Sequence, residues 1–364
     1  MNQAVQRPIV VMAGGTGGHV FPALAVAEYL RDKGETIVWL GTRAGIEARV
    51  VPAANFAIEW LSVQGLRGKG FGALILAPFR LVRACWQAFT TLLRLRPKAV
   101  LGMGGFVSGP GGLMAWMLNI PLFLHEQNSV IGLTNRLLGR FAKQRYFAFP
   151  DAASQVPGSE CIGNPIRAEL TDLEAPETRL AGRENRPMQL LVIGGSLGAA
   201  ALNRLLPEAV ALLDVSERPQ IKHQCGSSHV EVCKQQYRDA RVEADVFGFI
   251  EEMSEVYEWA DLVVCRAGAL TIAELTAVGL ASILVPYPFA VDNHQFYNAR
   301  FLQQHDAARI LVEEKLNAET LALQFRYFQQ NRDELLTMSV NARSLSQTNA
   351  TEILAQGILA GAKS

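Results

Sequence analysis

Residues 9–19 read Ile9-Val10-Val11-Met12-Ala13-Gly14-Gly15-Thr16-Gly17-Gly18-His19, and this stretch is the strongest indication of the fold class. The apolar residues at its start predict a buried strand, and a helix is expected from about Pro22 to Lys33 because proline suits a first helical turn. The glycines between them allow backbone N–H groups at the helix start to face an anion. The alternative is a tight strand–helix turn with no ligand.

Two common nucleotide-binding motifs do not fit this stretch. The third glycine of a dinucleotide fingerprint would fall at Val20, and the next predicted strand ends in Trp39-Leu40-Gly41 without an acid for a ribose. The sequence also contains no G-x-x-x-x-G-K-[ST] segment. Neither an NAD site nor a P-loop is therefore predicted.

Strands alternate with helices along the chain, and the series occurs twice. Residues 171–187 are rich in charge, proline and glycine, which predicts a linker or loop between the two series. Such alternation is typical of parallel sheets covered by helices on both faces, which bind ligands beyond the carboxyl ends of their strands. Further strands are predicted at 36–40, 99–101, 122–124 and 145–147, and then at 189–193, 221–223, 262–264 and 282–285.

We therefore predict an α/β protein of two doubly wound, Rossmann-like domains facing a central cleft. The first domain is expected at 1–165 and the second at 166–345, and the C-terminal helix 346–364 is a candidate to pack back on the first. The glycine-rich segment Gly194-Gly195-Ser196-Leu197-Gly198 repeats the turn at Gly14 to Gly18, and Gly102 to Pro110 forms a third such loop. Three anion-ready loops suit diphosphates on both sides of one cleft.

Composition limits the class of protein. The 364 residues are 49% apolar, enough for a core in each half, and the formal net charge is zero. A neutral chain has no global attraction to nucleic acid. The 5 cysteines form no C-x-x-C pair, which is typical of reduced thiols in the cytoplasm. The first apolar run is too short for a signal peptide, and no run is long enough to span a bilayer.

Several polar residues at predicted strand ends are candidates for chemistry, each with a structural alternative. His19 can accept a proton near neutral pH, or it can line the turn. His125-Glu126-Gln127-Asn128 follows a strand directly and forms either a binding loop or a hydrogen-bonded loop. Thr271 to Glu274 matches a capping box, whereas the functional interpretation makes Glu274 an acceptor for a ribose diol.

The segment from Arg67 to Arg96 interleaves apolar and basic residues and contains no acidic residue. A basic, apolar helix of this kind resembles a membrane-surface element. The alternative is an ordinary helix packed on the sheet, with Trp86 and the leucines in the core.

Taken together in their order, the motifs resemble the MurG family of N-acetylglucosaminyltransferases, which convert lipid I to lipid II in bacterial peptidoglycan synthesis. The motifs that carry this resemblance run through nearly the whole chain, as Gly14–His19, Gly102–Pro110, His125–Asn128, Gly163–Arg167, Gly194–Ala199, Arg266–Glu274 and Asp292–Ala299. Where that family often carries a second glutamine, this chain has His294 beside Gln295.

The resemblance implies a GT-B fold, with the acceptor on the N-terminal domain and UDP-GlcNAc mostly on the C-terminal one. It implies donor contacts at Thr16, Gly17, Gly18, Asn128, Arg167, Ser196, Ile250, Ala269, Leu270, Thr271, Ile272, Ala273, Glu274 and Gln295. It places the acceptor diphosphate at Gly14, Gly15, Gly104, Gly105 and Ser108. It implies docking on the cytoplasmic face of the inner membrane through Ile75, Leu76, Phe79, Arg80, Arg83, Trp86 and Trp116.

The expected reaction inverts the anomeric carbon of GlcNAc, with His19 as the base and Glu126 as the fallback base. Helix N-termini and Arg167 would stabilise the charge on the leaving UDP. The sequence has no D-x-D pair, so neither a metal nor a cofactor is predicted. The competing interpretations are a UDP-GlcNAc 2-epimerase and a non-catalytic nucleotide-sugar binding protein.

Overall fold

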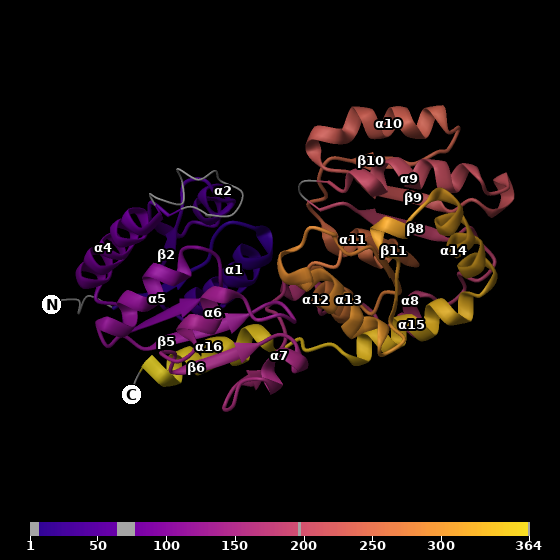
Figure 1. The fold of residues 1–364 in the computed structure, drawn as a ribbon. Coiled ribbons are helices and arrows are strands. Elements are labelled where there is room, and N and C mark those ends of the chain that lie inside the picture. The colour runs from indigo at the N-terminus through magenta and orange to yellow at the C-terminus, as the bar shows by residue number, and fades with distance from the viewer. Residues whose placement is uncertain (1–6, 64–76, 196–197, 363–364) are drawn as a thin grey trace. The chain divides into compact units, whose positions relative to one another are not determined.

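The computed structural model describes residues 7–63, 77–195 and 198–362, which form two compact units. One unit holds the described residues up to Ile166 and those from Thr348 onward, and the other holds Arg167–Gln347. Figure 1 shows that each unit is a sheet covered by helices. The predicted positions Ser196, Ile75 and Leu76 lie outside the described residues.

The first unit is a parallel sheet of 7 strands in the order β3-β2-β1-β4-β5-β6-β7. Its strands are β1 (Ile9–Met12), β2 (Ile37–Gly41), β3 (Ala57–Trp60), β4 (Ala99–Gly102), β5 (Leu122–Glu126), β6 (Gln144–Phe147) and β7 (Glu160–Cys161). Its helices are α1 (Gly17–Asp32), α2 (Glu47–Ala53), α4 (Ala77–Leu95), α5 (Ser108–Met117), α6 (Leu133–Leu138), α7 (Pro150–Ser154) and α16 (Ala350–Ala362).

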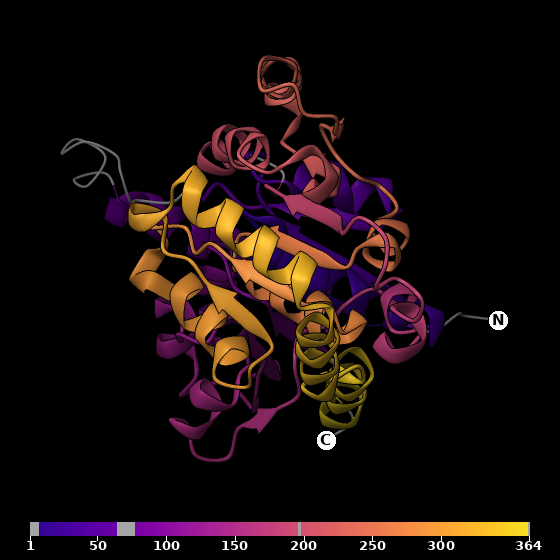
Figure 2. The same cartoon turned by 90° about the vertical axis from the view of Figure 1, so that its right-hand side faces the viewer.

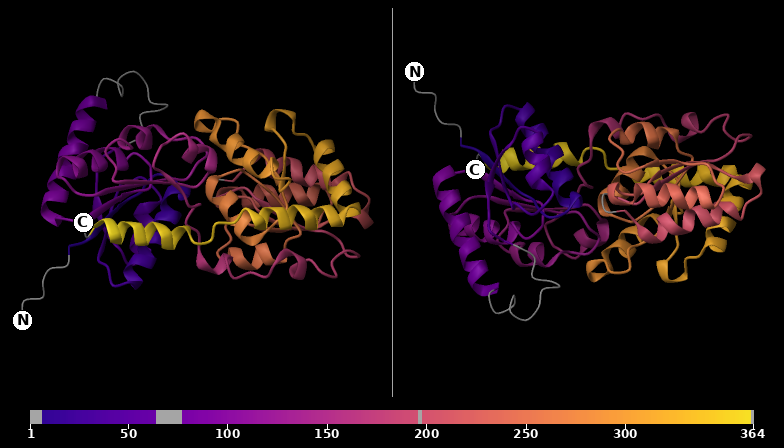
Figure 3. Two further views of the ribbon diagram at one scale, coloured as in Figure 1. Left: turned by 90° about the horizontal axis from the view of Figure 1, so that it is seen from below. Right: turned by 90° about the horizontal axis from the view of Figure 1, so that it is seen from above.

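Alternating side chains of the central strand β1 build a core on each face of this sheet. Ile9 and Val11 pack with α1 and α16, whereas Val10 and Met12 pack with α4 and α5. This alternation follows from the two-residue period of a strand. The C-terminal helix α16 lies beside α1. In the left panel of Figure 3, α16 is the yellow helix that runs along the first unit. Helices therefore cover both faces, as parallel strands require.

The second unit is a parallel sheet of 6 strands in the order β10-β9-β8-β11-β12-β13. Figure 2 views it with α14 in front of the strands. Its strands are β8 (Gln189–Ile193), β9 (Gln220–Gln224), β10 (Asp245–Phe247), β11 (Leu262–Cys265), β12 (Ser282–Leu284) and β13 (Ala308–Ile310). Its α-helices are α8 (Pro176–Arg179), α9 (Ala200–Ala211), α10 (Val230–Asp239), α11 (Met253–Trp259), α12 (Ala269–Val278), α13 (His294–Gln303), α14 (Ala318–Gln330) and α15 (Arg332–Ser344).

Residues 171–187, predicted as a linker or loop, consist of turns and bends with the short helix α8. This segment, which we call the strap, packs against the second unit. Arg179 of α8 is buried and donates to the carbonyl oxygens of Val278, at 2.8 Å, and Gly279. These carbonyls end helix α12, where they lack partners within the helix. Burial lowers the pKa of the Arg179 guanidinium to about 10. One charged residue of this segment, Arg179, therefore anchors the end of α12.

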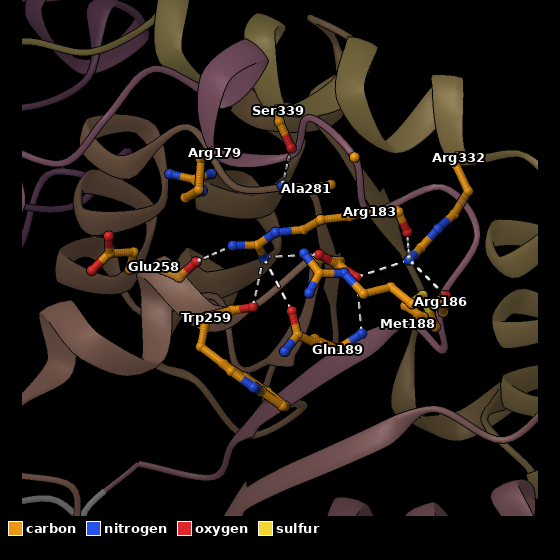
Figure 4. A network of polar contacts seen from close by, with 12 residues as sticks. Arg179, Arg183, Arg186, Met188, Gln189, Glu258, Trp259, Ala281, Arg332 and Ser339 are labelled. Carbon is orange, nitrogen blue, oxygen red and sulfur yellow. Dashed lines mark hydrogen bonds and ion pairs between the residues drawn. The ribbon is translucent and has the colours of Figure 1, made fainter.

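A second arginine of this strap joins a polar network around one buried carboxylate. Arg183 donates to Asp261, at 3.1 Å, and to the carbonyl of Trp259, at 2.8 Å (Figure 4). Arg332 donates to the other oxygen of Asp261 at 2.9 Å. Because Asp261 also accepts the backbone N–H of Gln189, its charge is met by three donors. The network ties the strap to the strands β8 and β11.

Candidate active site

In both sheets, the strand order changes direction between the two central strands. These are β1 and β4 in the first unit, and β8 and β11 in the second. Ligands of doubly wound sheets bind at such a switch point, beyond the carboxyl ends of the strands. The loops that leave these four strands contain the glycine-rich segments and the Arg266-Ala267-Gly268 turn singled out in the sequence.

The two glycine loops of the first unit touch each other. Gly105 has φ of +80°, and a Cβ there would lie 2.3 Å from the carbonyl oxygen of Gly14. Gly104 has φ of +92°, and a Cβ there would lie 2.9 Å from the ring of His19. Both positions therefore need glycine for conformation and for space. The structure thus brings together Gly14, Gly104, Gly105 and His19 within one unit.

Ser108 lies in the first turn of α5, below these loops. Its side chain is fully buried, and its hydroxyl lies 2.8 Å from the carbonyl oxygen of Gly104 and 3.2 Å from that of Met12. A hydroxyl held between two backbone carbonyls braces the loop and does not face a ligand. The Ser108 hydroxyl thus supports the loop, and the predicted contact of this position with the acceptor diphosphate stays a prediction.

Glu47 contacts the first glycine loop, and the sequence analysis did not identify this residue. Its carboxylate is fully buried and accepts from the backbone N–H of Gly15, at 3.0 Å, and from the N–H and hydroxyl of Thr42, at 3.0 and 2.7 Å. The Gly15 amide is therefore engaged by a protein carboxylate. No local pattern indicates this contact, because it joins the turn after β1 to the start of α2.

His19 is the third residue of α1, which begins at Gly17, several residues before the predicted start at Pro22. Its Nδ1 lies 3.0 Å from Oε1 of Gln127 in the loop after β5. Nε2 of Gln127 lies 3.2 Å from Nδ1 of His125, and Nε2 of His125 lies 2.8 Å from the carbonyl oxygen of Gly163. Burial lowers the pKa of His125 to about 4, so this imidazole is neutral at pH 7.

Glu126 is buried at the end of β5 and takes part in loop contacts. Its carboxylate accepts from the backbone N–H of Asn128, at 3.2 Å, the N–H of Gly132, at 3.0 Å, and Nδ2 of Asn135, at 2.8 Å. These donors hold the turn that presents Asn128, which is half-buried. Of the two predicted bases, His19 is the more open one in the described structure.

In the second unit, helix α12 begins at Ala269 with Gly268 as its N-cap residue. The capping-box interpretation of Thr271 and Glu274 is therefore wrong, because Thr271 already lies inside the helix. Ala269, Leu270 and Thr271 form the first turn, where backbone N–H groups lack helical partners and favour an anion. Ile272 and Ala273 continue the same helix, with Ile272 buried beneath this turn.

Glu274 is half-buried on α12 and has one hydrogen-bond donor that the sequence analysis did not identify. The hydroxyl of Tyr257, fully buried on α11, donates to Oε2 of Glu274 at 2.9 Å. Burial raises the pKa of the Glu274 carboxyl, while the Tyr257 hydrogen bond and the charge of Arg167 lower it. Arg167 thus acts electrostatically on Glu274, which links two of the predicted donor residues.

Two further predicted donor residues follow strands of this sheet. Gln295 lies in the first turn of α13, and its Oε1 accepts from the backbone N–H of Tyr287 at 2.9 Å. The residues before it, Asp292 and Asn293, both have positive φ, of 51° and 53°, a conformation that Asp and Asn tolerate. Ile250 is buried in the loop after β10. His294 turns back on its own backbone, with Nδ1 2.8 Å from the carbonyl of Val291.

An exposed apolar and basic face lies on α4 of the first unit. Ala84, Ala88 and Leu92 are its buried residues, so this stripe faces the protein. Phe79 is 74% exposed and Trp86 is 66% exposed, which excludes Trp86 from the core. Arg80 and Arg83 are exposed on the same helix, and Trp116 of the adjacent α5 is 46% exposed. We call Phe79, Arg80, Val82, Arg83 and Trp86 the α4 face.

Comparison with known proteins gives the family. A model described as the glycosyltransferase family 28 N-terminal domain matches residues 9–147, and one described as the family 28 C-terminal domain matches residues 189–356. The chain belongs to glycosyltransferase family 28. The two doubly wound sheets and this membership confirm the predicted fold class.

Individual family 28 relatives agree with this assignment. An enzyme of Marinobacter nauticus, named UDP-N-acetylglucosamine–N-acetylmuramyl-(pentapeptide) pyrophosphoryl-undecaprenol N-acetylglucosamine transferase, is 47% identical over 352 residues, which cover 97% of both chains. The crystal structure of Acinetobacter baumannii MurG has a TM-score of 0.84 at 40% identity, covering 97% of this chain and 99% of that one. The resemblance to the MurG family is thereby confirmed.

The competing epimerase class shares the fold only. UDP-GlcNAc 2-epimerase of Neisseria meningitidis has a TM-score of 0.65 but 12% identity, over 97% of this chain and 99% of that one. Such a likeness reports architecture and says nothing about chemistry. Within the described residues, no helix combines the length and hydrophobicity needed to cross a bilayer.

Proposed function

We propose that this chain transfers GlcNAc from UDP-GlcNAc to the C4 hydroxyl of the muramyl sugar of lipid I, giving lipid II. The relative named for this activity covers nearly the whole chain at 47% identity. The observation that carries the proposal is the position of His19 at the start of α1, with its ring against Gly104 and its Nδ1 bonded to Gln127. A histidine held in this way at a phosphate-ready loop suits deprotonation of an acceptor hydroxyl.

In the proposed reaction, the acceptor oxygen forms a bond to the anomeric carbon as the bond from that carbon to UDP breaks. His19 takes the hydroxyl proton, and the electron pair of the broken bond leaves with UDP. The transition state carries oxocarbenium character, and in-line attack inverts the anomeric centre. A well-placed base contributes about 10²–10⁴ in rate. Glu126, occupied by three donors, holds the loop and is the weaker candidate.

The donor is proposed to lie at the switch point of the second unit. The first turn of α12 would receive the diphosphate, and the loop that contains Ser196 would border it. Developing charge on UDP is then stabilised by helix N-termini and by Arg167. Glu274 would accept hydrogen bonds from the ribose hydroxyls, and the backbone of Ile250 would contact uracil. Asn128, Gln295 and the Thr16-Gly17-Gly18 turn are proposed to border the sugar and the donor.

The acceptor diphosphate is proposed to bind at the touching glycine loops of the first unit. Because Glu47 accepts the Gly15 N–H and the Ser108 hydroxyl lies against two backbone carbonyls, these two groups shape the loop. The backbone N–H of Ser108, at the start of α5, is proposed to face the phosphate. Gly14, Gly104 and Gly105 would allow a close approach to the backbone. The polyprenyl chain of this acceptor requires a nearby lipid surface.

We further propose that the α4 face and Trp116 rest on the cytoplasmic face of the inner membrane. The exposed aromatic residues would enter the headgroup region, and each basic residue near anionic lipid adds about 1 kcal/mol. The helix Ala77–Leu95 carries three arginines and no acidic residue, so nothing on it opposes an anionic surface. The proposed attachment is peripheral.

The first experiment is incubation with UDP-GlcNAc, UDP-GalNAc and a lipid I analogue, with the products read by mass. Transfer of GlcNAc to the analogue is the expected result. Conversion of UDP-GlcNAc to an isomer without acceptor would instead assign the chain to the epimerase class. No reaction with either substrate would leave a binding protein as the correct description.

The second experiment tests the base. His19→Ala should reduce turnover by about 10²-fold or more while the affinity for UDP stays nearly the same. His305→Ala, which changes an exposed histidine on the second unit, serves as the matched control and should be unaffected. Near-normal turnover of His19→Ala would remove this residue from the role.

A further inference from the structure

We propose that Gln127 and His125 act as positioning residues that hold His19 in the tautomer protonated on Nδ1, so that Nε2 is the atom that accepts the acceptor proton. This inference rests on the proposed function, because it specifies the base of that reaction. It is carried by a chain of hydrogen bonds whose direction two backbone carbonyls determine.

The direction begins at the buried end of the chain. Nε2 of His125 lies 2.8 Å from the carbonyl oxygen of Gly163, which can only accept. The proton of this imidazole must therefore be on Nε2, which leaves Nδ1 as an acceptor. His125 is fully buried, and burial keeps it neutral at the pH of the cytoplasm.

Gln127 transmits this direction to the active site. Its Nε2 lies 3.2 Å from the bare Nδ1 of His125 and 3.4 Å from the carbonyl oxygen of His125. Both partners can only accept, so the amide nitrogen must be on this side and the amide oxygen on the other. Gln127 is 1% exposed, which excludes the exchange of these contacts for water.

At His19, the remaining contact completes the assignment. Oε1 of Gln127 can only accept, and it lies 3.0 Å from Nδ1 of His19. Nδ1 therefore carries a proton whether the ring is neutral or charged, and only Nε2 gains and loses one. The ring cannot turn freely, because Gly104 lies against its Cε1 and Nδ1 edge.

Few charged groups lie on the segments around His19. The loop after β5 contributes Gln127 and, through it, the neutral His125, while Glu126 on the same loop is bonded to Asn128, Gly132 and Asn135. The turn after β1 is next to Glu47, which is bonded to Gly15 and Thr42. The loop after β4 contributes glycine. Both carboxylates are occupied by other donors, so the tautomer of His19 depends on the amide of Gln127.

In the reaction, His19 does not have to move a proton from one ring nitrogen to the other, because Nε2 is already unprotonated. The C4 hydroxyl transfers its proton to Nε2 while its oxygen bonds to the anomeric carbon and UDP departs with the electron pair of the broken bond. The positive charge that forms on the imidazole is stabilised by the partial negative charge on Oε1 of Gln127. A ring protonated on Nε2 could not accept this proton from the same side, and a wrong tautomer is costly in other His-based enzymes.

The direct test is nitrogen NMR of the full chain labelled with ¹⁵N in its histidine rings, at neutral pH. His19 and His125 are assigned by the signals lost in His19→Ala and His125→Gln. We expect His19 to be protonated on Nδ1 and His125 to be protonated on Nε2. A His19 ring protonated mainly on Nε2 overturns the proposal. Because this readout needs no turnover, it remains decisive even if the proposed transfer activity fails.

Kinetics of two variants supply a second test. Gln127→Met removes the relay and should lower kcat by about 10-fold or more without raising the KM for UDP-GlcNAc. Gln127→Glu keeps an oxygen that accepts from Nδ1 of His19, so it should keep the His19 tautomer and retain more activity than Gln127→Met. Gln144→Met, an amide change on β6 away from the relay, is the control.

A merely structural role for Gln127 predicts something different. Both variants would then lose activity equally, and the His19 tautomer would be unchanged in Gln127→Met. That result would overturn the relay while leaving His19 as the base. Normal turnover of Gln127→Met together with normal turnover of His19→Ala would overturn both the positioning role of Gln127 and the role of His19 as the base.

Discussion

Single side chains of the same type have different surroundings in this protein, and the surroundings separate their roles. Glu47 and Glu126 are buried and accept several N–H groups of the loops beside them, so they brace backbone. Glu274 is half-buried and accepts from one tyrosine hydroxyl, which leaves carboxylate lone pairs for a ligand. Of these three carboxylates, Glu274 is therefore the one whose surroundings support its proposed role in binding a substrate.

This assignment predicts that Glu274→Gln weakens UDP binding. A hydrogen bond to a charged group contributes about 1.5–3 kcal/mol, so the dissociation constant should rise about 10-fold or more. Calorimetric titration with UDP measures it, and Glu208→Gln, an exposed change on α9 of the same unit, is the control. Tyr257→Phe should raise the pKa of Glu274, since its hydrogen bond lowers that pKa, and UDP affinity should then fall at a higher pH. Equal affinity in all variants would contradict the role.

Sequence reasoning singled out His19, Glu126 and Glu274 as candidates because each follows a predicted strand end, and their roles stay predictions. It missed the contacts of Glu47, Gln127 and Tyr257, because each partner comes from a different element: Gly15 bonds to α2, His19 to the loop after β5, and Glu274 to α11. A single sequence contains no pattern for such contacts. The functions of individual polar residues thus depended on the packing.

At the scale of elements, the sequence predicted the strands that are buried on both faces and missed those at the edges. The central strands β1 and β8 were predicted with their observed bounds, β1 as a continuous apolar run and β8 as Gln189 followed by four apolar residues. The missed strands are short, partly exposed and mixed in composition, namely β3, β7, β10 and β13. The short helix α8 in the strap was also missed, and the contacts of Arg179 and Arg183 that hold the strap have no local sequence pattern.

The α4 face provides a prediction about an element. Changing Arg80 and Arg83 together to Glu should weaken binding to phosphatidylglycerol vesicles by at least about 10-fold, since two attractive charges of about 1 kcal/mol each become repulsive. Cosedimentation with the vesicles measures it. The control changes Lys234 and Arg238 to Glu on α10, which alters the net charge equally on an exposed helix of the other unit. Vesicle binding that resists both salt and the α4 change would show that the helix serves another purpose.

At the scale of the whole molecule, two similar sheets each enclose a buried histidine. In the second unit, His223 is hydrogen-bonded to the hydroxyl of Tyr237, at 2.9 Å, and to Oδ1 of Asn203, at 3.1 Å. Burial lowers the pKa of His223 to about 3 and that of His125 to about 4. Each folded unit thus keeps neutral an imidazole that the unfolded chain would protonate in mild acid.

The resulting prediction is a loss of stability in acid that both histidines share. Above about pH 6.5 neither state binds the proton, so the full stability is present. As the pH falls from about 6.5 towards 4, His125 and His223 become protonated in the unfolded chain but stay neutral in the folded protein. The free energy of unfolding therefore decreases by up to about 1.4 kcal/mol per pH unit for each histidine. Below about 4, His125 protonates in the folded state too and its contribution no longer changes.

Urea unfolding between pH 6.5 and 4.5 measures how steeply the free energy of unfolding decreases in acid. The variants can be compared directly, because titrating carboxylates contribute nearly the same decrease to each of them. His125→Gln and His223→Gln should each lose stability at pH 7, where their hydrogen bonds are broken, yet each should show a shallower decline in acid than the unchanged chain. His305→Gln, which changes an exposed histidine, should keep the original slope. If all four proteins decline in parallel, the buried imidazoles do not titrate as proposed, and the neutral His125 on which the relay depends would be in doubt as well.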